Sequence, residues 1–202
     1  MKILDKPIKE ELLVDKIFKV TEITPFDNYG EKRYRIKLEL GKYIYFYDYD
    51  SKRESDYSLE IIGGLTLPEG FFCDELKSET DKFTGEIRVS TPKLDGIYFL
   101  KVTKDNASRY LMFVSQQGAT PKIGTTGMFL LLTNNKKIEK PSTPIEVNVN
   151  GSGFLYSAFI VLTAEDIKLL TENQITDARV YVLDDIVRNG QKISEYLKCL
   201  IK

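Results

Sequence analysis

The chain has 202 residues, of which 42% are hydrophobic and 29% charged, and its 29 basic and 30 acidic side chains leave a net charge of −1. This balance argues against nucleic acid as the main partner, because non-specific binding to DNA or RNA needs a broad basic surface. The sequence holds no histidine, which excludes Ser-His-Asp and Cys-His catalytic arrangements and metal sites built on imidazole.

The first third of the chain has the pattern of an antiparallel meander. β-branched residues are frequent in residues 12–24, and turn-forming residues follow at 25–30. Residues 32–40 alternate apolar and charged side chains, which predicts the second strand of a half-buried hairpin. Gly41-Lys42 then makes a tight connection to a third strand at residues 43–49. We expect these strands to form an N-terminal domain, residues 1–70.

The middle of the chain continues with short strands and turns. Residues 73–82 predict either one weak helical turn or a loop, because they carry many charges. Apolar runs between turn-forming residues then predict strands, at residues 86–90, 96–103, 109–115, 128–133, 138–140, 144–149 and 154–162.

The last forty residues predict a strand-helix-strand-helix unit. Thr163 is a good N-cap for a helix that ends near Asn173, since its hydroxyl can accept from a free backbone amide. A strand is expected at residues 175–183, and apolar residues at helical spacing predict a second helix over 192–201. The fold class is therefore β-rich α+β, mostly antiparallel sheet or sandwich, with residues 71–202 either a second domain or continuous with the first.

Four tyrosines form the most unusual local pattern. Tyr43, Tyr45, Tyr47 and Tyr49 are two residues apart, so on a strand their rings share one face, with Ile44 and Phe46 on the other. If Ile44 and Phe46 face the core, the tyrosines form an aromatic row on the surface that suits protein contact, carbohydrate or single-stranded nucleic acid. The alternative is a row covered by neighbouring elements.

The other candidate sites fail on their spacing. Asp48, Asp50, Glu54 and Asp56 resemble the start of a calcium loop, but the turn glycine and the final glutamate of an EF-hand are missing. Residues 118–127 are rich in glycine and hydroxyl groups but lack the Gly-Lys-Ser/Thr ending of a phosphate-binding loop.

Two further pairs of residues do not indicate a functional site. Asp184-Asp185 forms a carboxylate pair typical of a solvent-facing turn. Cys73 and Cys199 have no spacing that places them together, so two idle thiols are favoured over a bridge. We expect no enzyme, no metal and no cofactor.

Several segments resemble a known group of proteins. These are Asp81-Lys-Phe-Thr-Gly85 followed by Thr91, then residues 161–170, 175–181 and 192–200. Over about residues 80–202 they are similar to uncharacterised small β-rich proteins of Bacteroidetes-type gut bacteria and their phages, including crAss-like phages. The resemblance carries no catalytic residues. It implies a phage virion protein or a host accessory protein.

The sequence favours a non-catalytic assembly protein. We expect a bacteriophage virion component, such as a head-tail connector or tail-ring subunit, whose partners are copies of itself and other assembly subunits. The alternative is a carbohydrate- or peptide-binding module that uses the tyrosine row. No signal peptide or membrane span is predicted, since the start is charged throughout and no run approaches about 20 apolar residues. The expected location is therefore the virion or the cytoplasm.

Overall fold

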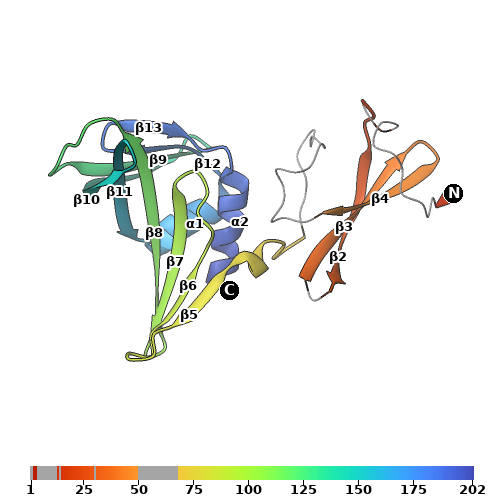
Figure 1. Cartoon of the computed structure of the whole chain (residues 1–202), viewed down its shortest axis with the longest axis horizontal. Helices are drawn as coiled ribbons and strands as arrows, with labels where there is room; N and C mark the ends of the chain where they lie inside the picture. Colours follow the sequence, from red (N-terminus) through yellow and green to blue (C-terminus); the bar gives the residue numbers. More distant parts are fainter. Residues whose placement is uncertain (1, 4–12, 14, 30, 50–67) are drawn as a thin grey trace. The chain divides into compact units, whose positions relative to one another are not determined.

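The described part of the protein is β-rich with two α-helices, and the predicted α+β class is confirmed. The computed structural model in Figure 1 describes residues 2–3, 13, 15–29, 31–49 and 68–202. The chain divides into two compact units, Met1–Glu69 and Gly70–Lys202, each with its own sheet.

The first unit contains the predicted meander. Its sheet has the order β1-β4-β3-β2, and β1 pairs with β4 in parallel while the other pairs are antiparallel. The predicted turn at residues 25–30 begins too early, because β2 continues through Pro25 to Asn28. A proline is tolerated there because β2 lies at the edge of the sheet, where no ladder hydrogen bond is lost. The strands are β1 Lys2–Ile3, β2 Lys19–Asn28, β3 Glu31–Leu40 and β4 Tyr43–Tyr49.

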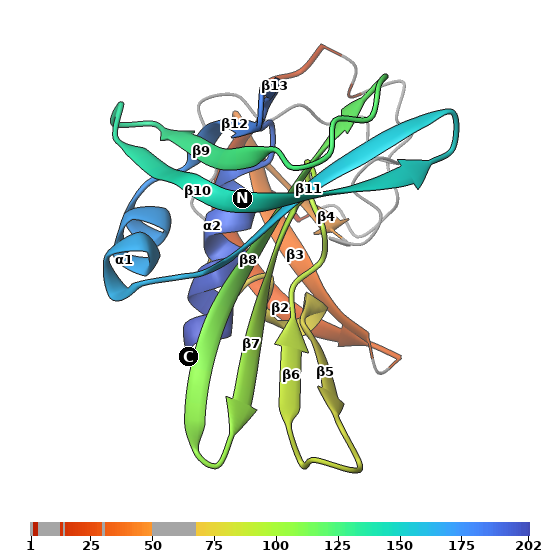
Figure 2. The same cartoon turned by 90° about the vertical axis from the view of Figure 1, so that its left-hand side faces the viewer.

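The second unit is built on a nine-stranded antiparallel sheet with the order β13-β12-β9-β10-β11-β8-β7-β6-β5. In Figure 2 the strands β6, β7 and β8 run vertically, whereas β9 and β10 run across them. The strands are β5 Lys77–Thr80, β6 Ile87–Ser90, β7 Ile97–Lys104, β8 Ala107–Gly118, β9 Thr126–Leu132, β10 Lys137–Asn150, β11 Gly153–Val161, β12 Ile175–Val180 and β13 Leu183–Ile186.

Strand β10 connects the two directions of this sheet. We predicted separate strands at residues 138–140 and 144–149, but they form one strand of 14 residues. Its first part pairs with β9, its register shifts between Lys140 and Pro144, and its second part pairs with β11. Strands that change partner at a bend form the corners of sandwich-like sheets, and a proline, which has no N–H to donate, suits such a point.

The helices cover one face of the sheet. Helix α1, Ala164–Glu172, begins with the predicted N-cap, as the Thr163 hydroxyl accepts from the Asp166 N–H and the Asp166 carboxylate accepts from the Thr163 N–H. Helix α2, Gly190–Ile201, begins two residues before the predicted start. A Cβ at position 190 would lie 2.2 Å from the carbonyl oxygen of Ile175, so glycine permits this close approach to β12.

The predicted strand at residues 175–183 is wrong in part. The chain turns at Tyr181, whose φ is +58°, and β12 and β13 form an antiparallel hairpin. The last part of the chain is therefore strand-helix-hairpin-helix. Residues 73–82 contain a short 3₁₀ helix, η3 Cys73–Glu75, and then strand β5.

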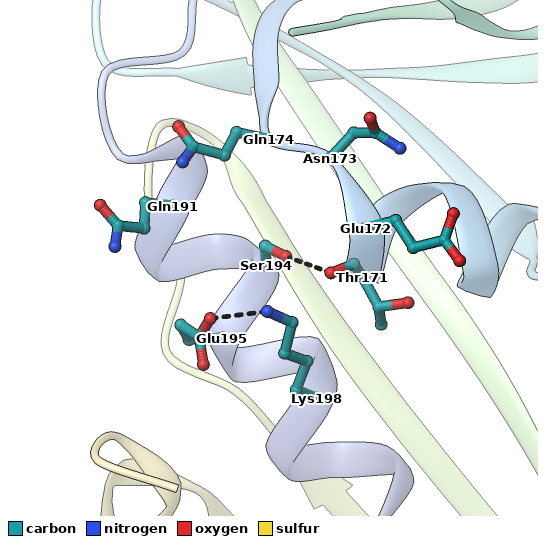
Figure 3. A pocket seen from close by; sticks show the side chains of 8 residues that line it. All are labelled: Thr171, Glu172, Asn173, Gln174, Gln191, Ser194, Glu195 and Lys198. Carbon is teal, nitrogen blue, oxygen red and sulfur yellow. Dashed lines mark hydrogen bonds and ion pairs between the residues drawn. The ribbon is translucent and has the colours of Figure 1, made fainter. Parts of the chain in front are cut away.

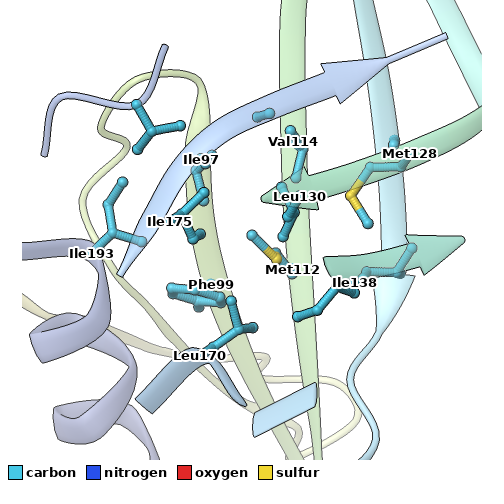
Figure 4. Packing of buried hydrophobic residues seen from close by; sticks show 14 of the residues in the cluster. Ile97, Phe99, Met112, Val114, Met128, Leu130, Ile138, Leu170, Ile175 and Ile193 are labelled. Atoms are coloured by element: carbon cyan, nitrogen blue, oxygen red, sulfur yellow. The ribbon is translucent and has the colours of Figure 1, made fainter. Parts of the chain in front are cut away.

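The core lies between the helices and the inner face of the sheet. Figure 4 shows Phe99 and Met112 from β7 and β8 beside Leu170 of α1, and Ile193 of α2 beside Ile175. Helix α2 also contributes Leu197, which is fully buried.

Cys73 and Cys199 form a disulfide, so the expectation of two idle thiols is wrong. The cysteines are 126 residues apart in sequence, but helix α2 packs beside η3. The residue spacing held no information about this contact, because the fold of the whole second unit produces it.

Candidate functional site

The tyrosine row lies on the face of the first sheet that carries the buried side chains of β3. As predicted, Tyr43, Tyr45, Tyr47 and Tyr49 share one face of β4. Across the ladder, three of them pair with Leu38, Ile36 and Tyr34 of β3, which are all buried. Tyr45 also contacts the ring of Phe18 edge-on, with centroids 5.4 Å apart. Only Tyr43 counts as exposed within the row, and the other three rings are half-buried.

The opposite face carries the charged groups. Arg35 donates two hydrogen bonds to Asp48, and Phe46 lies on the same face with 49% of its surface exposed. The condition that Ile44 and Phe46 both face the core is therefore not met, although Ile44 is buried. Asp50, Glu54 and Asp56 of the suspected calcium loop lie outside the described residues.

A second aromatic surface lies in the second unit, on the outer face of the nine-stranded sheet. Strand registers place its side chains in two rows across β7, β8 and β11. The face is opposite to the one that bears Phe99 and Met112, because side chains alternate along each strand. We call these six residues the outer patch: Tyr98, Phe113 and Phe159 in the first row, and Leu100, Leu111 and Val161 in the second.

The rings of the outer patch contact one another. The centroids of Tyr98 and Phe113 are 4.8 Å apart with the planes inclined by 31°, and those of Phe113 and Phe159 are 6.3 Å apart at 65°. The ammonium group of Lys93 lies 5.2 Å from the Phe113 centroid, which is a cation–π contact. The patch thus has an aromatic centre with a cation above it.

The patch is most open along β11. Phe159 and Val161 are 48% and 58% exposed. The ladder between β10 and β11 ends at the pair Ile145 and Ala158, and β10 then turns to pair with β9, while β11 continues to Val161. The bend in β10 thus leaves these two side chains without a neighbouring strand on one side.

Sequence reasoning missed this surface because the strands are apolar on both faces. Ile97, Tyr98, Phe99 and Leu100 follow one another without a polar residue, so the period of two that separates a covered face from an open one is hidden. A signal was nevertheless present, because aromatic residues occur in three neighbouring strands.

The remaining candidates are occupied by internal contacts. Asp184 accepts two hydrogen bonds from Arg179, which lower its carboxyl pKa, so Asp184-Asp185 is not a free acid–base pair. In the glycine-rich loop, Lys122 lies over the ring of Tyr181, and the Tyr156 hydroxyl donates to the Thr120 carbonyl. The described residues contain no group of three metal-ligating side chains.

A small polar recess lies between the end of α1 and helix α2, as Figure 3 shows. Its Ser194 hydroxyl donates to the carbonyl oxygens of Leu170 and Thr171, and Lys198 pairs with Glu195. The Ser194 hydrogen bonds join the two helices, so Ser194 is not placed as a nucleophile.

Comparison with protein-family models, curated proteins and solved structures gives no match for this chain. In the described part of the chain, neither helix is long and apolar enough to cross a membrane. The geometry of the outer patch is thus the main observation that bears on function.

Proposed function

We propose that this protein is a non-catalytic assembly protein whose second unit binds a further copy of the same chain through the outer patch. The observation that carries the proposal is the pair of apolar rows across β7, β8 and β11, open at Phe159 and Val161. Contiguous apolar surface of this kind marks interaction sites in soluble proteins.

A protein partner fits this surface better than a nucleic acid or a sugar. The three rings are inclined to one another by 31° and 65°, so they offer an uneven surface for interdigitating side chains rather than a flat stacking platform. Aromatic residues are enriched in protein interfaces, whose centres are apolar.

A copy of the same chain is favoured by charge. The chain's net charge of −1 means that two copies meet with little repulsion. Lys93 lies over the first row, while the exposed Glu146 pairs with Ser157, two residues from Phe159 on β11. The surface therefore carries charges of both signs, so in an isologous contact a charge on one copy can meet the opposite charge on the other.

The resemblance of residues 80–202 to phage and gut-bacterial proteins suggests which kind of assembly this is. Within this proposal the assembly is a virion, with a head-tail connector or a tail ring as the position. Both are built from many identical copies, which agrees with a surface that binds another copy of the same chain. The other assembly subunits are further partners in the same proposal.

Analytical ultracentrifugation over a wide concentration range tests the proposal. We expect the wild type to associate reversibly and the double variant Phe159→Ser/Val161→Ser to sediment as a monomer. The matched control is Phe83→Ser, which removes a fully exposed ring from the β5–β6 turn and is expected to associate like the wild type. A wild type that stays monomeric throughout, or a patch variant that associates equally well, contradicts the proposal.

A further inference from the structure

The disulfide joins the first and last structured segments of the second unit. Cys73 begins η3, three residues after the unit starts at Gly70, and Cys199 lies in α2, three residues before the chain ends. Both cysteines are half-buried. Neither cysteine belongs to the buried core of the unit.

Non-covalent contacts accompany the bond. The ring of Phe72 lies 5.8 Å from that of Tyr196, and the Lys192 ammonium lies 4.7 Å from the Phe72 centroid. The Tyr196 hydroxyl donates to the Glu75 carboxylate, and Lys192 lies 3.8 Å from the other oxygen of the same carboxylate. The side chains of Glu75 and Lys192 are only 13% and 14% exposed, so the two charges attract each other with little screening by solvent.

The two partners of the bond are anchored very differently. Helix α2 has twelve residues and buries Ile193, Leu197 and Leu200 in the core. Residues 70–76 hold a 3₁₀ helix of three residues with no side-chain cap at Phe72. They lead into β5, an edge strand whose four residues are all exposed. Phe71 and Phe72 are buried and, with Glu75, hold this short segment in place, but it has far fewer buried side chains than α2. It should therefore open with less free energy than the helix, which opens only with the core.

We propose that Cys73–Cys199 is a redox latch that controls the order of residues 70–80 and leaves the rest of the second unit folded. A dithiol reductant breaks the S–S bond, and two protein thiols form while the reductant is oxidised to its own disulfide. The reduced segment then separates from α2 more often. Helix α2 keeps its place, since its apolar side chains remain in the core.

Hydrogen exchange followed by mass spectrometry tests this latch in the full-length protein. The air-oxidised protein is compared with the same protein in dithiothreitol, and free thiols are counted in each sample. We expect two free thiols only after reduction. We also expect amide exchange in residues 70–80 to become at least about ten-fold faster, while the amides of α2 keep their rates to within about two-fold.

The double variant Cys73→Ser/Cys199→Ser is the control. It should exchange like the reduced wild type and should not respond to dithiothreitol. The latch is contradicted if the oxidised protein already has two free thiols or if residues 70–80 exchange equally in both states. It is also contradicted if α2 loses protection together with residues 70–80, because the bond would then hold the whole unit. None of these readouts depends on self-association, so the result is independent of the proposed assembly function.

Discussion

The two faces of the nine-stranded sheet have similar side chains and opposite environments. Phe99 and Met112 on the inner face are fully buried beneath the helices, while their chain neighbours Tyr98 and Phe113 lie on the outer face and are half-buried against each other. The difference comes from what covers each face and not from composition. Side chains alternate between the two faces along each strand. Whether an apolar residue in this sheet packs in the core or lies on the outer surface is therefore set by its position along the strand.

Replacement of adjacent residues on β8 tests this comparison with the largest expected effect. Met112→Ala leaves a cavity in the core and should lower the free energy of unfolding by about 2–5 kcal/mol. Phe113→Ala removes a half-buried ring and should cost about 1 kcal/mol. Urea unfolding followed by circular dichroism measures both values. Equal losses for the two variants would show that the outer patch is part of the core.

A buried ion pair gives the next effect, on the side of the sheet that the helices cover. Burial alone would raise the pKa of Asp166, but the hydrogen bonds that its carboxylate accepts from Lys140 and from the Thr163 N–H outweigh this effect and lower the pKa. Asp166→Ala removes the carboxylate that accepts from the Thr163 N–H and pairs with Lys140, while the Thr163 hydroxyl still accepts from the backbone N–H of residue 166, and it should cost about 1–2 kcal/mol.

The sign of the pH effect follows from that lowered pKa. A carboxyl group whose pKa is lower in the folded state stabilises the fold above its unfolded pKa of about 4, and this stabilisation is lost as the pH falls through the folded value. The Tm of the wild type should therefore fall more steeply below about pH 4 than the Tm of Asp166→Ala. Parallel Tm curves for the two proteins would contradict the assignment.

The sequence predicted features that depend on near neighbours. The alternation in residues 32–40 gave strand β3, and Thr163 gave the start of α1, because each depends on groups within a few residues. It also showed that the four tyrosines share a face of β4. Alternation cannot show which face is covered, however. It therefore could not show that Phe46, a possible core residue, is exposed.

The features that the sequence did not predict depend on distant segments. The Cys73–Cys199 bond joins residues 126 positions apart, and it exists because α2 packs against η3 although nine strands and helix α1 lie between them in the chain. The outer patch depends on the register of three strands and on the bend in β10 between Lys140 and Pro144. No local pattern contains this information.

The smallest expected effect concerns an exposed pair on the β12–β13 hairpin. Arg179 donates two hydrogen bonds to Asp184 and thereby lowers its pKa, as in the buried pair. More than half of each side chain is exposed to solvent, so water and salt screen the attraction. Asp184→Asn should therefore cost about 0–1 kcal/mol, and the loss should shrink further at 1 M salt. A loss as large as that of Asp166→Ala, measured in the same urea titration, would mean that the number of hydrogen bonds, and not burial, sets the contribution of an ion pair in this protein.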